Sequence, residues 1–314
     1  MSDSVATPMF KKIAFVGIGL IGSSMAHGAR KLGLAGEISG YARREETRAA
    51  ARKAGFADTL HKELEPCVRD ADLVVLAAPV GSFAKIAPAI RPHLAKGALV
   101  TDVGSVKVAV VRDVGPHLPE GVHFIPGHPV AGTEQSGPGA GFAKLFEGRW
   151  CILTPPPGTN AEAVEKLKDF WERLGSMVEI MDPAHHDLVL AITSHVPHLI
   201  AYNIVGTAAD LEEVTESEVI KFSAGGFRDF TRIAASDPTM WRDVFLNNRE
   251  AVLEMLGRFN EDLSALQRAI RWGDGDELQN FFTRTRAIRR SIIEAGQDIE
   301  APDFGRVNKD KDGE

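Results

Sequence analysis

A glycine-rich turn near the N-terminus constrains the fold of this chain more than any other feature. The apolar segment 13–16 runs into Gly17-Ile18-Gly19-Leu20-Ile21-Gly22, and a helix-compatible stretch follows. A G-x-G-x-x-G spacing between a strand and a helix is typical of a dinucleotide-binding turn. Gly17 permits the turn, Gly19 lets the backbone approach a pyrophosphate, and Gly22 lets the helix pack on the strand. We expect this turn, with Leu20 and Ile21 at the helix start, to bind the cofactor; the alternative is an ordinary tight turn.

Strand-like and helix-like segments alternate through the first half of the chain. Strands are expected at 13–17, 37–41, 73–79, 98–103, 123–129, 151–154 and 177–182, and helices at 20–32 and 45–53. This alternation predicts an α/β domain with a doubly wound, mostly parallel sheet of the Rossmann type.

The second half is helical. After Asp182 the strand-like runs disappear and apolar residues recur at helical spacing, which predicts an amphipathic helix that buries one face. The stripe consists of Val252, Leu256, Phe259, Leu263, Leu266 and Ile270. Gly273–Asp276 breaks this helix, a further helix is expected at 277–295, and the polar tail from Asp303 is expected to fray. We therefore divide the 314 residues into a dinucleotide-binding domain at 1–183 and a helical domain at 184–314.

Composition narrows the class of protein. The net charge of -7 gives no reason to expect binding to nucleic acid or to an anionic membrane. Cys67 and Cys151 lack metal-type spacing and fit a reducing compartment. The N-terminus has no apolar signal core, and the longest apolar run, 73–80, is too short to span a membrane. We expect a cytoplasmic protein.

The end of the second strand indicates the choice of cofactor. An acidic residue there would bind the ribose hydroxyls of NAD. This chain has Ala42 followed by Arg43 and Arg44, whose guanidinium groups could hold a 2′-phosphate. We therefore expect NADP to be preferred and NAD to remain usable. Two alternatives stay open: the arginines could be a solvated helix start, and Glu45 or Glu46 could turn back to the ribose.

Two strand ends carry candidate catalytic residues. Ser105, in the stretch 101–107, could cap the next helix or point its hydroxyl at the nicotinamide. His128 lies at the end of the next strand and is fixed in position by Pro129. Imidazole titrates near neutral pH, so His128 suits the base that a dehydrogenase needs to take a hydroxyl proton. The loop 133–141 could cover the site.

The helical half adds polar candidates. His195 and His198 would share a helix face with Ser194 nearby. With His185 and His186 they raise the question of a metal, but no matching carboxylate or cysteine set accompanies them, so we expect contacts to an anionic substrate instead. The glycine turn at 225–226 precedes arginines that could hold a carboxylate, or could form surface ion pairs.

Together these stretches resemble the prephenate/arogenate dehydrogenase family, which makes the tyrosine precursor. Its markers appear in order over roughly 10–295: VGIGLIGSS, TDVGSVK, PGHPVAGTEQSG, TSHVPHLIA and GGFRDFTRIAASDPTMWRDVF. The resemblance implies a Rossmann domain followed by a helical domain that forms a homodimer. It also implies oxidative decarboxylation of prephenate or arogenate, with hydride transfer from the ring to the nicotinamide.

The resemblance implies residue roles as well. His128 matches the catalytic histidine that accepts the hydroxyl proton, and Ser105 matches a serine that bridges the nicotinamide and that histidine. Asp187 and Arg228 match an ion pair near the site entrance, and Trp241 matches an aromatic of the pocket region, although core packing would explain it equally. The residues that match substrate-binding positions are Ser194, His195, His198, Arg232, Thr133 and Glu134.

Three further expectations follow. Nothing in the sequence separates prephenate from arogenate. No regulatory domain is expected after the helical domain, so tyrosine would bind, if at all, in the active site as a product analogue. The rival functions are a β-hydroxyacid dehydrogenase, which would depend on a catalytic lysine such as Lys221, and a cofactor-binding redox sensor without chemistry.

Overall fold

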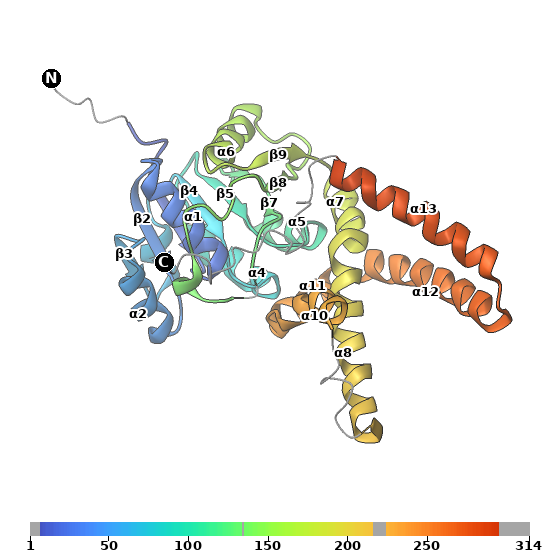
Figure 1. The fold of residues 1–314 in the computed structure, drawn as a ribbon. Coiled ribbons are helices and arrows are strands. Elements are labelled where there is room, and N and C mark those ends of the chain that lie inside the picture. The colour runs from blue at the N-terminus through green and yellow to red at the C-terminus, as the bar shows by residue number, and fades with distance from the viewer. Residues whose placement is uncertain (1–6, 134, 216–223, 295–314) are drawn as a thin grey trace. The chain divides into compact units, whose positions relative to one another are not determined.

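The computed structural model describes residues 7–133, 135–215 and 224–294, which form two compact units, Met1–Met255 and Leu256–Glu314. The expected frayed tail from Asp303 and the rival lysine, Lys221, lie outside the described residues. The first unit contains every part of the candidate site and is shown with the rest of the ribbon in Figure 1.

A six-stranded parallel sheet forms the centre of the first unit. Its strands are β1 (Phe10–Val16), β2 (Ala35–Tyr41), β3 (Thr59–His61), β4 (Leu73–Leu76), β5 (Leu99–Asp102) and β6 (His123–Phe124). They lie in the order β3-β2-β1-β4-β5-β6, and every pair is parallel. This is the strand order of a dinucleotide-binding Rossmann fold, so the predicted fold class is confirmed.

Helices cover both faces of the sheet because successive side chains of a buried strand point to opposite sides. Ile13 and Phe15 of β1 pack with α1 (Leu20–Lys31) and α6 (Ala161–Arg173). Ala14 and Val16 face α3 (Leu64–Val68), α4 (Phe83–Ile90) and α5 (Val108–Val114). The helix α2 (Glu45–Ala54) begins and ends within one residue of the expected bounds and closes at Gly55, whose φ is 72°.

The strand expected at 123–129 is two strands in two sheets, so the expectation of one strand was wrong. Ile125 N still donates to Val100 O, but Pro126 has no N–H with which to continue that ladder. The chain then pairs elsewhere: β7 (Gly127–Pro129) runs antiparallel to β8 (Trp150–Leu153), which is parallel to β9 (Met177–Ile180). This second sheet places His128 beside the carboxyl end of β5.

Beyond β9 the described residues are helical, as expected. The helix α7 (Pro183–Leu190) is capped by the Asp182 side chain and continues through a π-helical turn, Ala191–His195, into α8 (Val196–Thr215). By length and composition alone, with a mean hydropathy of 1.5, the stretch Pro183–Leu211 could cross a membrane. Two shorter helices, α10 (Gly225–Thr231) and α11 (Pro238–Asn247), complete this part.

The second unit contains most of α12 (Arg249–Trp272), and α13 (Gly275–Glu294). Gly273, with φ 69°, separates the two helices where the break was expected. The expected apolar stripe lies on α12, but Leu263 and Ile270 are 52% and 67% exposed in the single chain. The stripe therefore does not bury its whole face within one chain.

Candidate active site

The glycine-rich turn connects β1 to α1 and has the geometry that a dinucleotide site needs. Gly17 has φ 103°, and a Cβ there would lie 2.5 Å from the Ala77 carbonyl carbon. A Cβ on Gly22 would lie 2.5 Å from the Gly17 oxygen, so both glycines are required by packing. Gly19 differs because nothing lies within 4 Å of its Cβ position. That open space lies at the start of α1, where free N–H groups attract a phosphate.

The second strand ends where the cofactor's ribose is expected. Arg43 and Arg44 are exposed, and neither side chain has a hydrogen-bond or ion-pair partner among the described residues. Glu45, by contrast, is bound by Arg52 and Arg48, and these hydrogen bonds lower the pKa of its carboxyl. Glu45 is thus held along α2, which weakens the alternative that it turns back to the ribose.

A buried ion pair lies at the carboxyl end of β5. Lys107 Nζ lies 2.5 Å from Asp102 Oδ2 and donates to the Gly127 carbonyl at 2.6 Å, and both charged side chains are fully buried. Asp102 also accepts hydrogen bonds from the backbone N–H groups of Gly104 and Gly127. Burial raises the pKa of Asp102 and lowers that of Lys107, while their pairing opposes both shifts. The pair connects β5 to β7, directly before His128.

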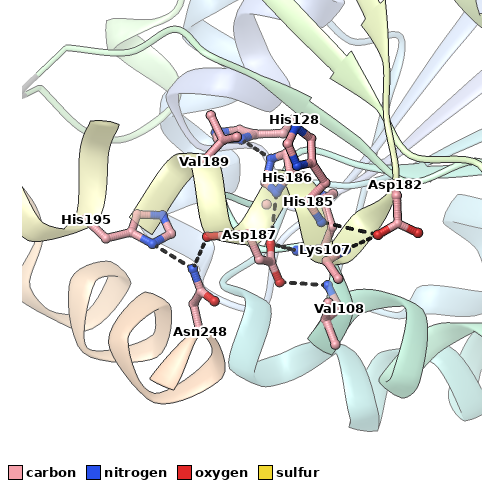
Figure 2. Close-up of polar contacts among 12 residues, drawn as sticks. Lys107, Val108, His128, Asp182, His185, His186, Asp187, Val189, His195 and Asn248 are labelled. Carbon is pink, nitrogen blue, oxygen red and sulfur yellow. Dashed lines mark hydrogen bonds and ion pairs between the residues drawn. The ribbon is translucent and has the colours of Figure 1, made fainter. Parts of the chain in front are cut away.

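His128 is part of a chain of hydrogen bonds that ends at Asp187 (Figure 2). Its Nδ1 lies 2.8 Å from His186 Nε2, and His186 Nδ1 lies 2.8 Å from Asp187 Oδ1. Asp187 Oδ1 accepts from Lys107 N at 2.7 Å, and its Oδ2 accepts from Val108 N at 2.9 Å. A carboxylate from α7 thereby caps the start of α5 and anchors two histidines.

The backbone of the same aspartate is linked to a third histidine, His195, through the side chain of Asn248. Asn248 Nδ2 donates to the Asp187 carbonyl at 2.8 Å and lies 3.0 Å from His195 Nδ1 (Figure 2). His195 is fully buried, and its Nε2 has no hydrogen-bond partner among the described residues. The backbone of Ser105 lies close enough to this ring to affect its pKa.

His198 and His195 meet on one aromatic residue, as their expected shared face requires. The His198 ring stacks on Trp241 at 3.8 Å between centroids, and His195 approaches the same indole edge-on at 6.1 Å. His198 Nδ1 lies 2.8 Å from the Ser194 carbonyl, so Nδ1 is the donor. Trp241 is buried and also packs with Val244 in the core, so its core-packing interpretation is confirmed, and its role in the pocket stays a prediction.

Burial keeps these histidines neutral. It lowers the pKa of His128 well below 6.5, and the neighbouring His186, Lys107 and His195 lower it further. It lowers the pKa of His195 to about 4 and also that of His186, although Asp187 opposes both shifts. For His198, burial lowers the pKa and nearby Arg232 adds to the effect. A neutral imidazole can accept a proton, so the site can supply a base.

The remaining expected site residues that the structure describes take no part in the hydrogen-bond chains that join Asp187 to His128 and His195. Arg232 is exposed and lies near His198. Ser194 is half-buried beside His198. Ser105 is half-buried at the start of the segment that leads into α5. Thr133 is exposed and accepts from Gln135 N, and Glu134 lies outside the described residues.

One expected contact was wrong. The expected ion pair between Asp187 and Arg228 is not formed: Asp187 is 3% exposed and binds Lys107, Val108 and His186, whereas Arg228 lies 3.6 Å from Asp229. That the loop 133–141 covers the site stays a prediction. Its short 3-10 helix, Pro138–Ala140, packs against α1 and α2, and Phe142 N donates to Ser24 Oγ at 3.1 Å.

Four residues that organise the site were not assigned roles by sequence reasoning: Asp102, Lys107, His186 and Asn248. An acid at the end of a buried strand with a lysine five residues later could have indicated the first pair. No sequence signal connects Asn248 to Asp187, 61 positions earlier. Over the described ranges no three His, Cys, Asp or Glu side chains form a group able to hold a metal ion.

Comparisons with known proteins agree with the geometry. Residues 25–180 match the family described as prephenate dehydrogenase, nucleotide-binding domain, and residues 182–284 match prephenate dehydrogenase, dimerization domain. The chain is 41% identical to a cyclohexadienyl dehydrogenase of Zymomonas mobilis over 284 residues, 90% of this chain and 97% of the relative. It is 34% identical to a prephenate dehydrogenase of Bacillus subtilis over 89% of this chain and 76% of the relative.

Two solved structures are similar over nearly the whole chain. One is a prephenate dehydrogenase from A. aeolicus, crystallised with hydroxyphenyl propionate and NAD+, with 36% identity and a TM-score of 0.83 over 90% of this chain and 98% of that one. The other is a Synechocystis arogenate dehydrogenase, with 28% identity and a TM-score of 0.72 over 89% and 99%.

Proposed function

The chain belongs to the prephenate dehydrogenase family, and from this we propose that its reaction takes place at His128. The family reaction is oxidative decarboxylation of a cyclohexadienyl substrate in tyrosine biosynthesis, with a nicotinamide cofactor. The hydrogen-bond chain from Asp187 to His128 is the observation that carries the proposal, because it gives a neutral, oriented imidazole in the middle of β7.

The turn 17–22 and Ser105 would hold the cofactor. The open space at the Cβ position of Gly19 and the free N–H groups at the start of α1 fit a pyrophosphate. The bound nicotinamide would accept a hydride from the substrate ring. Arg43 and Arg44 support NADP as the preferred form, since both guanidinium groups are available to a 2′-phosphate; NAD remains usable.

His128 performs the proton transfer in this proposal. As hydride leaves the ring carbon that bears the hydroxyl group, His128 accepts that hydroxyl's proton at Nε2. The ring carboxylate leaves as carbon dioxide, and the electron pair of the broken bond completes the aromatic ring. The proton then returns to the phenolate oxygen, so the atoms and charges balance. Aromatisation drives the reaction, and the protein chiefly orients the reactants.

Polar residues of the π-helical turn and of α8, together with Arg232 between α10 and α11, would bind the substrate. Arg232 and His198 lie near each other and would hold a carboxylate, with Ser194 and His195 beside them. Thr133 and Glu134 would lie by the side chain of prephenate or arogenate. Tyrosine would bind in the same pocket as a product analogue. We assign 1–183 to cofactor binding and 184–314 to substrate binding and dimerisation. We also propose that the protein acts in the cytoplasm.

A groove in the second unit supports the homodimer. It measures about 520 Å³ and lies between α12 and α13. Its apolar lining includes Leu263, Leu266, Ile270, Leu278 and Phe282. An exposed apolar groove of this kind favours burial against another protein surface. We assign it to the same face of a second copy.

The test is a spectrophotometric assay of reduced nicotinamide with prephenate or arogenate, each with NADP or NAD. Turnover with either substrate that disappears in His128→Asn supports the proposal. Absence of turnover in all four mixtures, from folded protein that still binds dinucleotide, would reject it and leave the redox-sensor alternative.

A further inference from the structure

We propose that Asp187 sets opposite tautomers on two histidines: His128 keeps the lone pair on Nε2, and His195 keeps the proton on Nε2. Two hydrogen-bond chains leave this one residue, one from its side chain and one from its backbone. The inference rests on the proposed function of His128 and assigns positioning roles to Asp187, His186 and Asn248.

When both rings are neutral, the first chain has only one consistent arrangement of protons. The Asp187 carboxylate accepts hydrogen bonds from two backbone N–H groups and, as a carboxylate, can only accept. Its Oδ1 must then accept from His186 Nδ1, at 2.8 Å. A neutral His186 protonated on Nδ1 has a lone pair on Nε2, so it accepts from His128 Nδ1, also at 2.8 Å. The lone pair of His128 is left on Nε2.

The second chain gives the opposite result. The Asp187 carbonyl can only accept, so the Asn248 atom that faces it is the amide nitrogen. The same nitrogen lies 3.0 Å from His195 Nδ1 and donates its other hydrogen to it. His195 Nδ1 is therefore an acceptor, and the proton of this neutral ring is on Nε2.

The two tautomers suit two tasks in one site. His128 presents a lone pair that can take the substrate's hydroxyl proton. His195 presents an N–H group that can only donate to an oxygen. The helical segment from α7 to α8 carries Asp187, His186 and His195, whereas β7 carries His128. Residues of the helix therefore fix the tautomer of the base on the strand.

Variants of His186 separate positioning from general structural support. His186→Gln can imitate the ring, because its amide N–H donates to Asp187 and its amide oxygen accepts from His128. His186→Leu can do neither. We expect the Leu variant to lose kcat on the order of 10²–10⁴-fold with little change in KM, since this is what a positioned base contributes. The Gln variant should keep kcat within about tenfold of native. His185→Leu, exposed on the same helix, is the control and should match the native enzyme.

The tautomers are measured directly by nitrogen NMR of histidine-labelled protein, with signals assigned by removing single histidines. We expect His128 protonated on Nδ1 and His195 on Nε2, with His186→Leu changing only the former and Asn248→Leu only the latter. A native His128 protonated on Nε2, or equal kcat in the Leu and Gln variants, would overturn the inference. Absence of turnover in the native enzyme would instead reject the proposed function, and the NMR spectra would still report the tautomers.

Discussion

Lys107 Nζ lies 2.5 Å from Asp102 Oδ2 in the interior of the protein, and neither side chain is exposed. A third group, the Gly127 carbonyl, completes the lysine's environment one residue before the proposed base. The pair therefore fixes the spacing between the end of β5 and the strand that carries His128.

Lys107→Met should destabilise the fold by about 3–5 kcal/mol, because it leaves a buried carboxylate without its partner. Urea denaturation measures the change. The double variant Lys107→Met, Asp102→Asn should recover part of the loss, since it removes the unpaired charge as well. If the single variant unfolds like the native protein, the pair contributes little to stability.

Two glycine substitutions should have different effects on the cofactor site. Gly19→Ala should leave the melting temperature unchanged, because its Cβ meets no protein atom within 4 Å, but it should weaken dinucleotide binding at least tenfold. Gly17→Ala should destabilise the protein itself, because the Cβ would overlap the Ala77 backbone. Calorimetry with and without dinucleotide distinguishes the two. Normal dinucleotide affinity in Gly19→Ala would place the pyrophosphate elsewhere.

Arg43→Ala with Arg44→Ala should raise KM for NADP roughly 10–100-fold and leave KM for NAD nearly unchanged, since hydrogen bonds to charged groups contribute about 1.5–3 kcal/mol. The measurement is steady-state kinetics with each cofactor. Lys53→Ala, at an exposed position on the helix α2 that follows the two arginines, is the matched control. A parallel loss with both cofactors would argue against a 2′-phosphate site.

The pH profile should report the burial of His128. The reactive form is the neutral ring, and burial lowers its pKa well below 6.5. As the pH falls, the base therefore stays neutral past 6.5, and activity should be lost only at lower pH. The acid limb of kcat/KM, which reports the free enzyme, should have its midpoint below 6.5. A midpoint above 6.5 would show that His128 is not the base that controls this limb.

The groove between α12 and α13 should decide the oligomeric state. Ile270→Glu and Leu263→Glu each place a charge on an exposed apolar position that lines it. Either variant should convert a dimer to monomers, as measured by sedimentation or light scattering. The free-energy cost of burying an unpaired charge in the interface exceeds the stabilisation that the apolar contact gave. Leu32→Glu, an equally exposed apolar position at the end of α1, should leave the dimer intact.

Local sequence patterns predicted much of the fold because turns, buried strands and helix ends depend on residues that are close together in the chain. The order of glycines around Gly17 encodes a turn between a strand and a helix, and the apolar run of β4 encodes a strand that is buried on both faces. Gly55 and Gly273 mark the ends of α2 and α12 because a positive φ favours glycine there. The single strand expected at 123–129 was wrong because Pro126 breaks the ladder, and only a neighbouring strand decides where the chain pairs next.

The sequence by itself determined the glycine-rich turn between β1 and α1 and the helical character after Asp182, since each depends on residues close together in the chain. Only the tertiary structure decided which residues hydrogen-bond to one another in the site. Asp187 meets Lys107 across 80 positions, and Asn248 meets Asp187 across 61. Hydrogen bonds act over about 3 Å, so the residue that sets the protonation of His128 is chosen by how β5, β7 and α7 pack together, and no local pattern can specify that choice.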